Sequence, residues 1–139
     1  MRIVVDASIA VKWVVDEPRT EAALALRDEQ LIAPALWLAE AANTLWRHVR
    51  LGEMTSDEAF ARMAELGNAP VASFAIEPHV ARALEIAVQI NHPVYDCFYL
   101  ALALHEGITL VTDDRRFAAA AATRPGLAGP IRLLGSGQL

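Results

Sequence analysis

The stretch Arg2-Ile3-Val4-Val5-Asp6 is a short run of mostly β-branched residues that ends in an acid. It is apolar without alternation, which is typical of a strand buried on both faces of a sheet. Two further apolar runs lie at Leu31-Ile32-Ala33 and at Ile108–Val111. Helical patterns, rather than tight turns, separate these runs. The sequence therefore predicts parallel strands joined by crossover helices.

The remaining elements follow from periodicity and from start and stop signals. Thr55 and Glu58 have the spacing of a capping box, and Gly52, Gly67 and Gly107 stand where helical patterns end. Further strands are expected at 70–76 and 131–134, and helices at 7–15, 17–30, 34–51, 55–67, 78–90, 94–106 and 113–122. We expect one domain over residues 1–139, a three-layer α/β/α fold with a central parallel sheet of four to five strands.

Composition narrows the class of protein. The chain has 139 residues, of which 55% are hydrophobic and 21% charged, which fits a globular domain and not a disordered one. Its one cysteine, Cys97, excludes an internal disulfide and a cysteine-rich zinc site. The longest apolar run, Pro93–Leu104, is interrupted by Asp96 and is too short for a membrane span. With no signal-peptide pattern at the start, a cytoplasmic protein is expected.

Charge and missing motifs exclude several functions. The net charge of −5 argues against a broad basic surface for nucleic acid, although bound divalent cations can supply positive charge locally. The sequence contains neither a P-loop nor a G-x-G-x-x-G motif, which excludes the commonest nucleotide-binding folds. It also lacks the G-x-S-x-G motif of α/β-hydrolases.

Acidic residues at four places in the sequence are candidates for a functional role. Asp6 and the pair Asp113-Asp114 follow expected strands, where open parallel sheets bind ligands and where helix caps are also common. Asp96 lies in a helix that is apolar nearly all round, so it should be paired, protonated or bound to metal unless it only complements the helix dipole. Glu40 lies opposite an apolar stripe, where an ordinary exposed glutamate is equally compatible.

Other residue types carry less signal. His48, His79, His92 and His105 are scattered, and their spacing does not predict metal ligands. Core packing is the expectation for Cys97 and for the aromatic residues, namely Tyr95, Phe98, Tyr99 and the tryptophans.

Four segments in order resemble the motifs of the PIN-domain ribonucleases, and in particular of the VapC-type toxins of bacterial toxin–antitoxin pairs. They are Ile3-Val4-Val5-Asp6-Ala7-Ser8, Pro34-Ala35-Leu36-Trp37-Leu38-Ala39-Glu40, Tyr95-Asp96-Cys97-Phe98-Tyr99-Leu100-Ala101-Leu102-Ala103 and Leu110-Val111-Thr112-Asp113-Asp114-Arg115-Arg116-Phe117. The resemblance covers almost the whole chain.

The resemblance implies a set of site residues. Asp6, Glu40, Asp96 and Asp114 would form an acidic cluster that binds Mg²⁺ or Mn²⁺, with one or two ions per site. Asp6, Asp96 and Asp114 would hold the principal ion, directly or through water, and Glu40 would position or activate the attacking water. Hydrogen bonds from Ser8 and Thr112 would orient the carboxylates, with Asp113 as a neighbour of the cluster. Arg116 replaces an acid found in one version of the fourth motif, which bears on the number of ions.

The resemblance also implies an activity and partners. The protein would be a metal-dependent endoribonuclease toxin that cleaves structured RNA, such as tRNA or ribosomal RNA, inhibits translation and leaves a 5′-phosphate and a 3′-hydroxyl. A VapB-type antitoxin would neutralise it, and it would form a homodimer. Arg47, Arg115 and Arg116 are the candidate RNA contacts. Leu24, Leu26, Leu36 and Trp37 are candidate dimer contacts, and core packing suits each of them as well.

Two other functions stay open at this stage. One is a catalytically silent PIN-like module that binds protein or RNA. The other is a Mg²⁺-dependent phosphatase or receiver-like domain, in which Asp6 is phosphorylated. The second needs a lysine near a late strand, and the only lysine, Lys12, is expected in another part of the fold.

Overall fold

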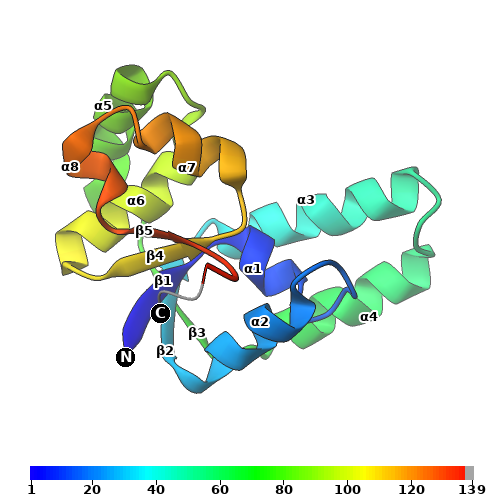
Figure 1. Cartoon of the computed structure of the whole chain (residues 1–139). Coiled ribbons are helices and arrows are strands. Elements are labelled where there is room, and N and C mark those ends of the chain that lie inside the picture. The colour runs from blue at the N-terminus through cyan, green and yellow to red at the C-terminus, as the bar shows by residue number, and fades with distance from the viewer. Residues whose placement is uncertain (137–139) are drawn as a thin grey trace.

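A five-stranded parallel sheet forms the centre of the computed structural model, which describes residues 1–136 (Figure 1). The strand order is β3-β2-β1-β4-β5. The strands are β1 (Arg2–Val5), β2 (Gln30–Pro34), β3 (Val71–Phe74), β4 (Thr109–Thr112) and β5 (Ile131–Leu133). The predicted parallel sheet is thus confirmed. The expected end of the domain at residue 139 lies outside the described residues.

The helices follow the expected order, but a helix at Pro125–Ala128 was not expected, and the helix expected over 17–30 is a shorter helix followed by a 3₁₀ turn. They are α1 (Ala7–Val11), α2 (Thr20–Ala25), α3 (Trp37–Arg50), α4 (Ser56–Gly67), α5 (Val80–Ile90), α6 (Val94–Glu106), α7 (Arg115–Ala121) and α8 (Pro125–Ala128). Short 3₁₀ turns lie at Leu26–Asp28 and Glu77–His79. The capping box of Thr55 and Glu58 is present. The helix expected over 7–15 ends at Val11, because the next amides bond three residues back instead of four.

The chain reverses its direction across the sheet once, and this places the helices in two layers. From β1 it moves outward to β2 and β3, and right-handed crossovers put α1 to α4 on one face. It then returns past β1 to β4 and β5, which puts α5 to α8 on the opposite face (Figure 1). The architecture is therefore the predicted three-layer α/β/α arrangement.

Helix α6 is the central helix of the core. It packs against β1, β2 and β4, and every residue from Cys97 to Ala103 is buried. This explains why its sequence is apolar on all sides. Leu26 and Trp37, two of the candidate dimer contacts, belong to the core as well, whereas Leu24 is exposed. In the described part of the chain, no helix combines the length and apolar character that crossing a membrane requires.

The reversal of the chain creates a crevice at the carboxyl ends of the two central strands, β1 and β4. Strands β1 and β4 are neighbours, although the connections that leave them run to opposite sides. Such a switch point opens a cleft beyond the carboxyl ends of the strands. Asp6 follows β1 and Asp113-Asp114 follows β4, so the topology brings these acids to the same place.

Candidate active site

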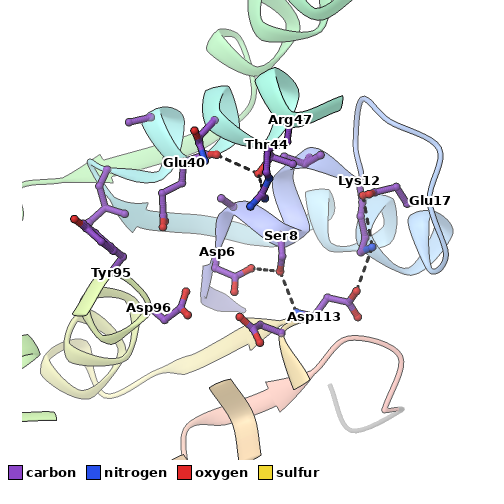
Figure 2. A pocket seen from close by; sticks show the side chains of 16 residues that line it. Asp6, Ser8, Lys12, Glu17, Glu40, Thr44, Arg47, Tyr95, Asp96 and Asp113 are labelled. Carbon is purple, nitrogen blue, oxygen red and sulfur yellow. Dashed lines mark hydrogen bonds and ion pairs between the residues drawn. The ribbon is translucent and has the colours of Figure 1, made fainter. Parts of the chain in front are cut away.

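A cleft of about 600 Å³ opens at the switch point between β1 and β4 (Figure 2). Its walls come from α1 and Glu17 beyond it, from α3 as far as Arg47, from the first turn of α6, and from the segment between β4 and α7. Six acidic residues and two basic residues line it: Asp6, Glu17, Glu40, Asp96, Asp113 and Asp114, with Lys12 and Arg47. The four acids of the predicted cluster therefore all reach one cavity.

Asp6 lies at the floor of the cleft and is nearly inaccessible to solvent. It caps α1, where its Oδ1 accepts a hydrogen bond from the amide of Ile9. Asp6 therefore both caps a helix and lines the cleft, so the capping and the functional interpretations of this residue are compatible. Burial raises the pKa of Asp6 to about 7, and the nearby charge of Asp96 adds to the rise, against hydrogen bonds that lower it.

Two hydroxyl groups tie Asp6 to the loop after β4. Ser8 donates to Oδ1 of Asp6 at 2.5 Å and accepts from the amide of Asp113 at 3.1 Å. Thr112 donates to Oδ2 of Asp6 and accepts from the amide of Asp114 at 3.0 Å. Both oxygens of Asp6 are thereby held, and the loop that carries Asp113 and Asp114 is fixed against the end of β1.

Glu40 projects into the cleft from the first turn of α3. The hydroxyl of Tyr99, on α6, donates to Oε1 of Glu40 at 2.5 Å. Burial raises the pKa of Glu40 above its ordinary range, although this hydrogen bond lowers it. Burial, together with the charge of Glu40, also raises the pKa of Tyr99, which therefore keeps its proton as a donor. Tyr99 holds the carboxylate with one oxygen left for other contacts.

Asp96 and Asp114 face each other across the cleft floor, and His92 lies beside them. Within residues 1–136, the group of three side chains with ligand atoms close enough for one metal ion consists of His92, Asp96 and Asp114, all within 4.8 Å of one another. Asp114 also caps α7, accepting from the amide of Phe117 at 3.0 Å. Burial raises the pKa of Asp96, opposed by the contact with His92 and reinforced by Asp114.

Asp113 points away from this group and forms ion pairs. Its Oδ2 lies 3.2 Å from Nζ of Lys12, and Arg19 binds both of its oxygens at 2.7 and 2.9 Å. Burial acts to raise the pKa of Asp113, but the hydrogen bonds from Arg19 and Lys12 outweigh it and leave the pKa below its ordinary value. Asp113 thus anchors the loop after β4.

The position of Lys12 differs from the sequence expectation. It was expected far from any late strand, yet its ammonium group, only 6% exposed, reaches the end of β4 and also lies 3.7 Å from Glu17. The sequence expectation was wrong because α1 packs against β4, a contact between segments about a hundred residues apart.

The candidate RNA contacts occupy two different places. Arg47 lines the cleft, and its guanidinium donates to Thr44 at 3.3 Å. Arg115 and Arg116 are exposed in the first turn of α7 and are not among the lining residues. Tyr95, expected in the core, is instead 62% exposed at the cleft rim (Figure 2).

Comparison with known proteins agrees with this arrangement. The family model for the PIN domain matches residues 3–122, which spans all four acidic positions of the cleft. The chain belongs to the PIN-domain family.

Relatives of this PIN domain carry VapC names. "Ribonuclease VapC3" of Pyrobaculum aerophilum is 36% identical over 124 residues, which is 85% of this chain and 93% of the relative. The crystal structure of PAE2754 from Pyrobaculum aerophilum superposes with a TM-score of 0.71 at 25% identity, covering 94% of this chain and 83% of that one. The Mycobacterium tuberculosis toxin VapC20, titled a sarcin-ricin loop cleaving toxin, has a TM-score of 0.63 at 20% identity over 85% of this chain and 94% of its own. This last likeness concerns the fold alone.

Some residues of this PIN domain's cleft escaped the sequence analysis. Tyr99 was expected only as core, and Lys12 and Arg19 received no site role. Tyr99 contacts Glu40 across 59 positions, and Lys12 and Arg19 contact Asp113 across 101 and 94 positions. His92 had one usable signal, its spacing of four residues before Asp96. That spacing can bring two side chains together at the start of a helix, even where one of them precedes it.

Proposed function

We propose that this protein is a metal-dependent endoribonuclease that acts as the toxin of a toxin–antitoxin pair. The observation that carries the proposal is the convergence of Asp6, Glu40, Asp96 and Asp114 in one cleft of a PIN domain. Structured RNA, such as tRNA or ribosomal RNA, is the expected substrate. The name of a relative that is 36% identical, ribonuclease VapC3, supports this direction.

The donor set of the cleft fits a divalent cation. Six carboxyl groups face two basic side chains in the cleft. Burial raises the pKa values of Asp6, Glu40 and Asp96, and a bound cation would offset the cost of ionising them. Hard oxygen ligands suit Mg²⁺ and Mn²⁺. Asp6, Asp96 and Asp114 are the residues that would hold one or two such ions, directly or through water. When bound, such a cation lowers the pKa of water and neutralises charge that develops on the phosphate.

The chain's own groups supply orientation and proton transfer. Ser8 and Thr112 fix the plane of the Asp6 carboxylate, and Tyr99 fixes Oε1 of Glu40. Oε2 of Glu40 accepts the proton of the attacking water. The water oxygen then bonds to phosphorus as the bond between phosphorus and the 3′-oxygen breaks. The 3′-oxygen takes up a proton from solvent, and Glu40 releases its proton to solvent. A 5′-phosphate and a 3′-hydroxyl result.

A phosphatase or receiver-like role is less compatible with this geometry. Such a role needs a carboxylate oxygen that can reach a phosphorus atom, and Asp6 is only 6% exposed, with both oxygens held by hydrogen bonds. Lys12, although in the cleft, is held by Asp113 and Glu17.

The test is incubation of purified protein with total bacterial RNA, with Mg²⁺ or Mn²⁺ and with EDTA, followed by sequencing of new 5′ ends. We expect discrete, metal-dependent cuts that are lost in Asp6→Asn and in Asp96→Asn. Asp57→Asn, on the exposed first turn of α4, is the matched control and should cut like wild type. Folded protein that binds metal but makes no cuts would favour the silent binding module instead.

Toxicity and partners need separate measurements. Expression of wild type, but not of Asp96→Asn, should arrest growth of a bacterial host, and co-expression of a VapB-type antitoxin should relieve the arrest. We propose a homodimer, for which light scattering coupled to size exclusion should give twice the chain mass of 15.1 kDa.

A further inference from the structure

His92 is placed where it can act on the metal group of the cleft. It lies in the short segment between α5 and α6, and its Nε2 is 2.7 Å from Oδ2 of Asp96. A carboxylate oxygen of Asp114 completes the set, with all three ligand atoms within 4.8 Å of one another. Around an ion with bonds of roughly 2.1 Å, neighbouring ligand atoms lie about 3 Å apart and opposite ones about 4.2 Å apart. The three side chains are therefore close enough to converge on one ion, which would take the place of the proton shared by Nε2 of His92 and Oδ2 of Asp96.

The surroundings of His92 hold its ring in this position. The imidazole packs on the ring of Phe117, with centroids 5.1 Å apart, and its side chain is 12% exposed. The backbone amide of His92 bonds to the carbonyl of Ala87 at the end of α5. Phe117 also donates its own amide to Oδ1 of Asp114. One residue thus positions both His92 and Asp114.

Oxygen atoms remain for coordination on both acids. The amide of Phe117 uses Oδ1 of Asp114, and His92 contacts Oδ2 of Asp96. Among the hydrogen bonds of residues 1–136, none uses Oδ2 of Asp114 or Oδ1 of Asp96. The ligand atoms of His92, Asp96 and Asp114 form one group within 4.8 Å, and among the described residues Asp6 is not part of that group. His92 is therefore better placed than Asp6 to share one ion with Asp96 and Asp114.

We propose that His92 supplies an imidazole nitrogen to the divalent cation site formed with Asp96 and Asp114, so that this site selects Mn²⁺ over Mg²⁺. The proposal rests on the metal-dependent function proposed above, and it adds a ligand and a preference. Mg²⁺ favours an all-oxygen shell, and imidazole favours transition-metal ions. One nitrogen among carboxylates consequently shifts the preference toward Mn²⁺.

Pulsed electron paramagnetic resonance of the Mn²⁺-loaded protein tests this directly, because a coordinated imidazole gives a ¹⁴N coupling. We expect this coupling in wild type and its loss in His92→Gln. Glutamine can still donate a hydrogen bond to Asp96 but offers no ring nitrogen, so the variant separates ligation from positioning. His105→Gln is the matched control, since His105 is exposed and lies nine residues, about 13 Å, further along α6 from Asp96. It should keep the coupling.

Calorimetric titration with Mn²⁺ and with Mg²⁺ gives a second readout, with folding of each variant checked by thermal unfolding. The ratio of Mn²⁺ to Mg²⁺ affinity should fall by on the order of tenfold in His92→Gln and stay unchanged in His105→Gln. Wild type that binds Mn²⁺ without ¹⁴N coupling would overturn the role of His92 and leave it a positioning residue for Asp96. A coupling or an affinity ratio that survives in His92→Gln would do the same. Folded wild type that binds neither ion would instead contradict the proposed function itself.

Discussion

The hydroxyl of Thr112 donates a hydrogen bond to Oδ2 of Asp6 and so joins the ends of β4 and β1 at the floor of the cleft. The two residues are 106 positions apart in sequence, and both are buried. The same hydroxyl accepts from the amide of Asp114, so one threonine orients an acid on each side of the switch point.

Removal of this hydroxyl should weaken the fold and the site together. In Thr112→Val, Oδ2 of Asp6 loses its donor inside the core, and a hydrogen bond to a charged group is worth about 1.5–3 kcal/mol. We expect a loss of that size in the free energy of unfolding, measured by urea denaturation at mildly alkaline pH, and slower RNA cleavage. Thr112→Ser keeps the hydroxyl and should stay close to wild type. Unchanged stability in Thr112→Val would show that the hydrogen bond contributes nothing, and a loss in Thr112→Ser alone would assign the contribution to the methyl group.

The raised pKa of Asp6 predicts a pH dependence of stability in the metal-free protein. A carboxyl group whose pKa is higher in the folded state than in the unfolded state binds its proton more tightly on folding. Its stabilising contribution is therefore present at acid pH and is lost as pH rises through about 7. Between about pH 5.5 and about pH 8.5, with EDTA, Asp6 alone should lower the free energy of unfolding by roughly 2 kcal/mol.

Asp6→Asn isolates this effect from those of Glu40 and Asp96, whose pKa values shift in the same direction. Denaturation curves of the variant should fall less steeply with pH, and the variant should exceed wild type in stability at the alkaline end. Added Mn²⁺ should stabilise wild type most at that end. Parallel pH profiles for the two proteins would contradict the assignment of Asp6 as the titrating group.

Much of this fold was predictable from sequence, and the reasons are local. Runs such as Ile3–Val5 and Ile108–Val111 are apolar without alternation because both faces of the sheet are covered, and α6 is apolar all round because it is the central helix of the core. The strand order was not predictable. A buried strand carries no mark of its neighbours, and only the structure places β1 beside β4.

The candidate site divides in the same way. Asp6 and the pair Asp113-Asp114 could be found because each follows a strand, and Asp96 because it interrupts an apolar helix. The choice of Asp114 over Asp113 came from family resemblance. Glu40 was also indicated only by resemblance, since the hydroxyl that holds it belongs to Tyr99, 59 residues away. The pairing of Lys12 with Asp113 was not predictable for the same reason, because an ion pair between distant segments leaves no spacing in the sequence.

Loss of the Lys12 ammonium group should destabilise the protein more than loss of the neighbouring guanidinium. Lys12→Met leaves Asp113 and Glu17 without a buried counter-charge, and breaking a buried ion pair costs about 3–5 kcal/mol. Because Arg19 still binds Asp113, we expect a loss near 3 kcal/mol, the lower end of that range, by urea denaturation. Arg19 is 38% exposed, so Arg19→Met should cost no more than about 1 kcal/mol. A larger loss of stability in Arg19→Met than in Lys12→Met would show that Arg19, and not Lys12, holds the loop between β4 and α7.

We predict that Tyr95 stacks on a base of the RNA substrate proposed above. It lies at the cleft rim, next to Asp96, with 62% of its surface exposed. Stacking of a base on an aromatic side chain is worth about 1–3 kcal/mol. Tyr95→Ala should therefore raise KM for a short RNA about tenfold or more, with kcat little changed, and Tyr95→Phe should behave like wild type. An unchanged KM in Tyr95→Ala would exclude stacking at this position.

We expect the three candidate arginines to contact different parts of the RNA. Arg47 lines the cleft, whereas Arg115 and Arg116 lie in the first turn of α7, outside it. Each phosphate contact with a single strand contributes about 0.7 to the slope of log affinity against log salt concentration. Binding of a short single-stranded RNA to catalytically silent Asp96→Asn protein should lose about one such increment with Arg47→Gln. The double change Arg115→Gln and Arg116→Gln should leave this slope unchanged for the short RNA and reduce it for an RNA long enough to extend over α7. If the double variant instead reduces the slope for the short RNA, the short RNA contacts α7, and Arg47 is not its main phosphate contact.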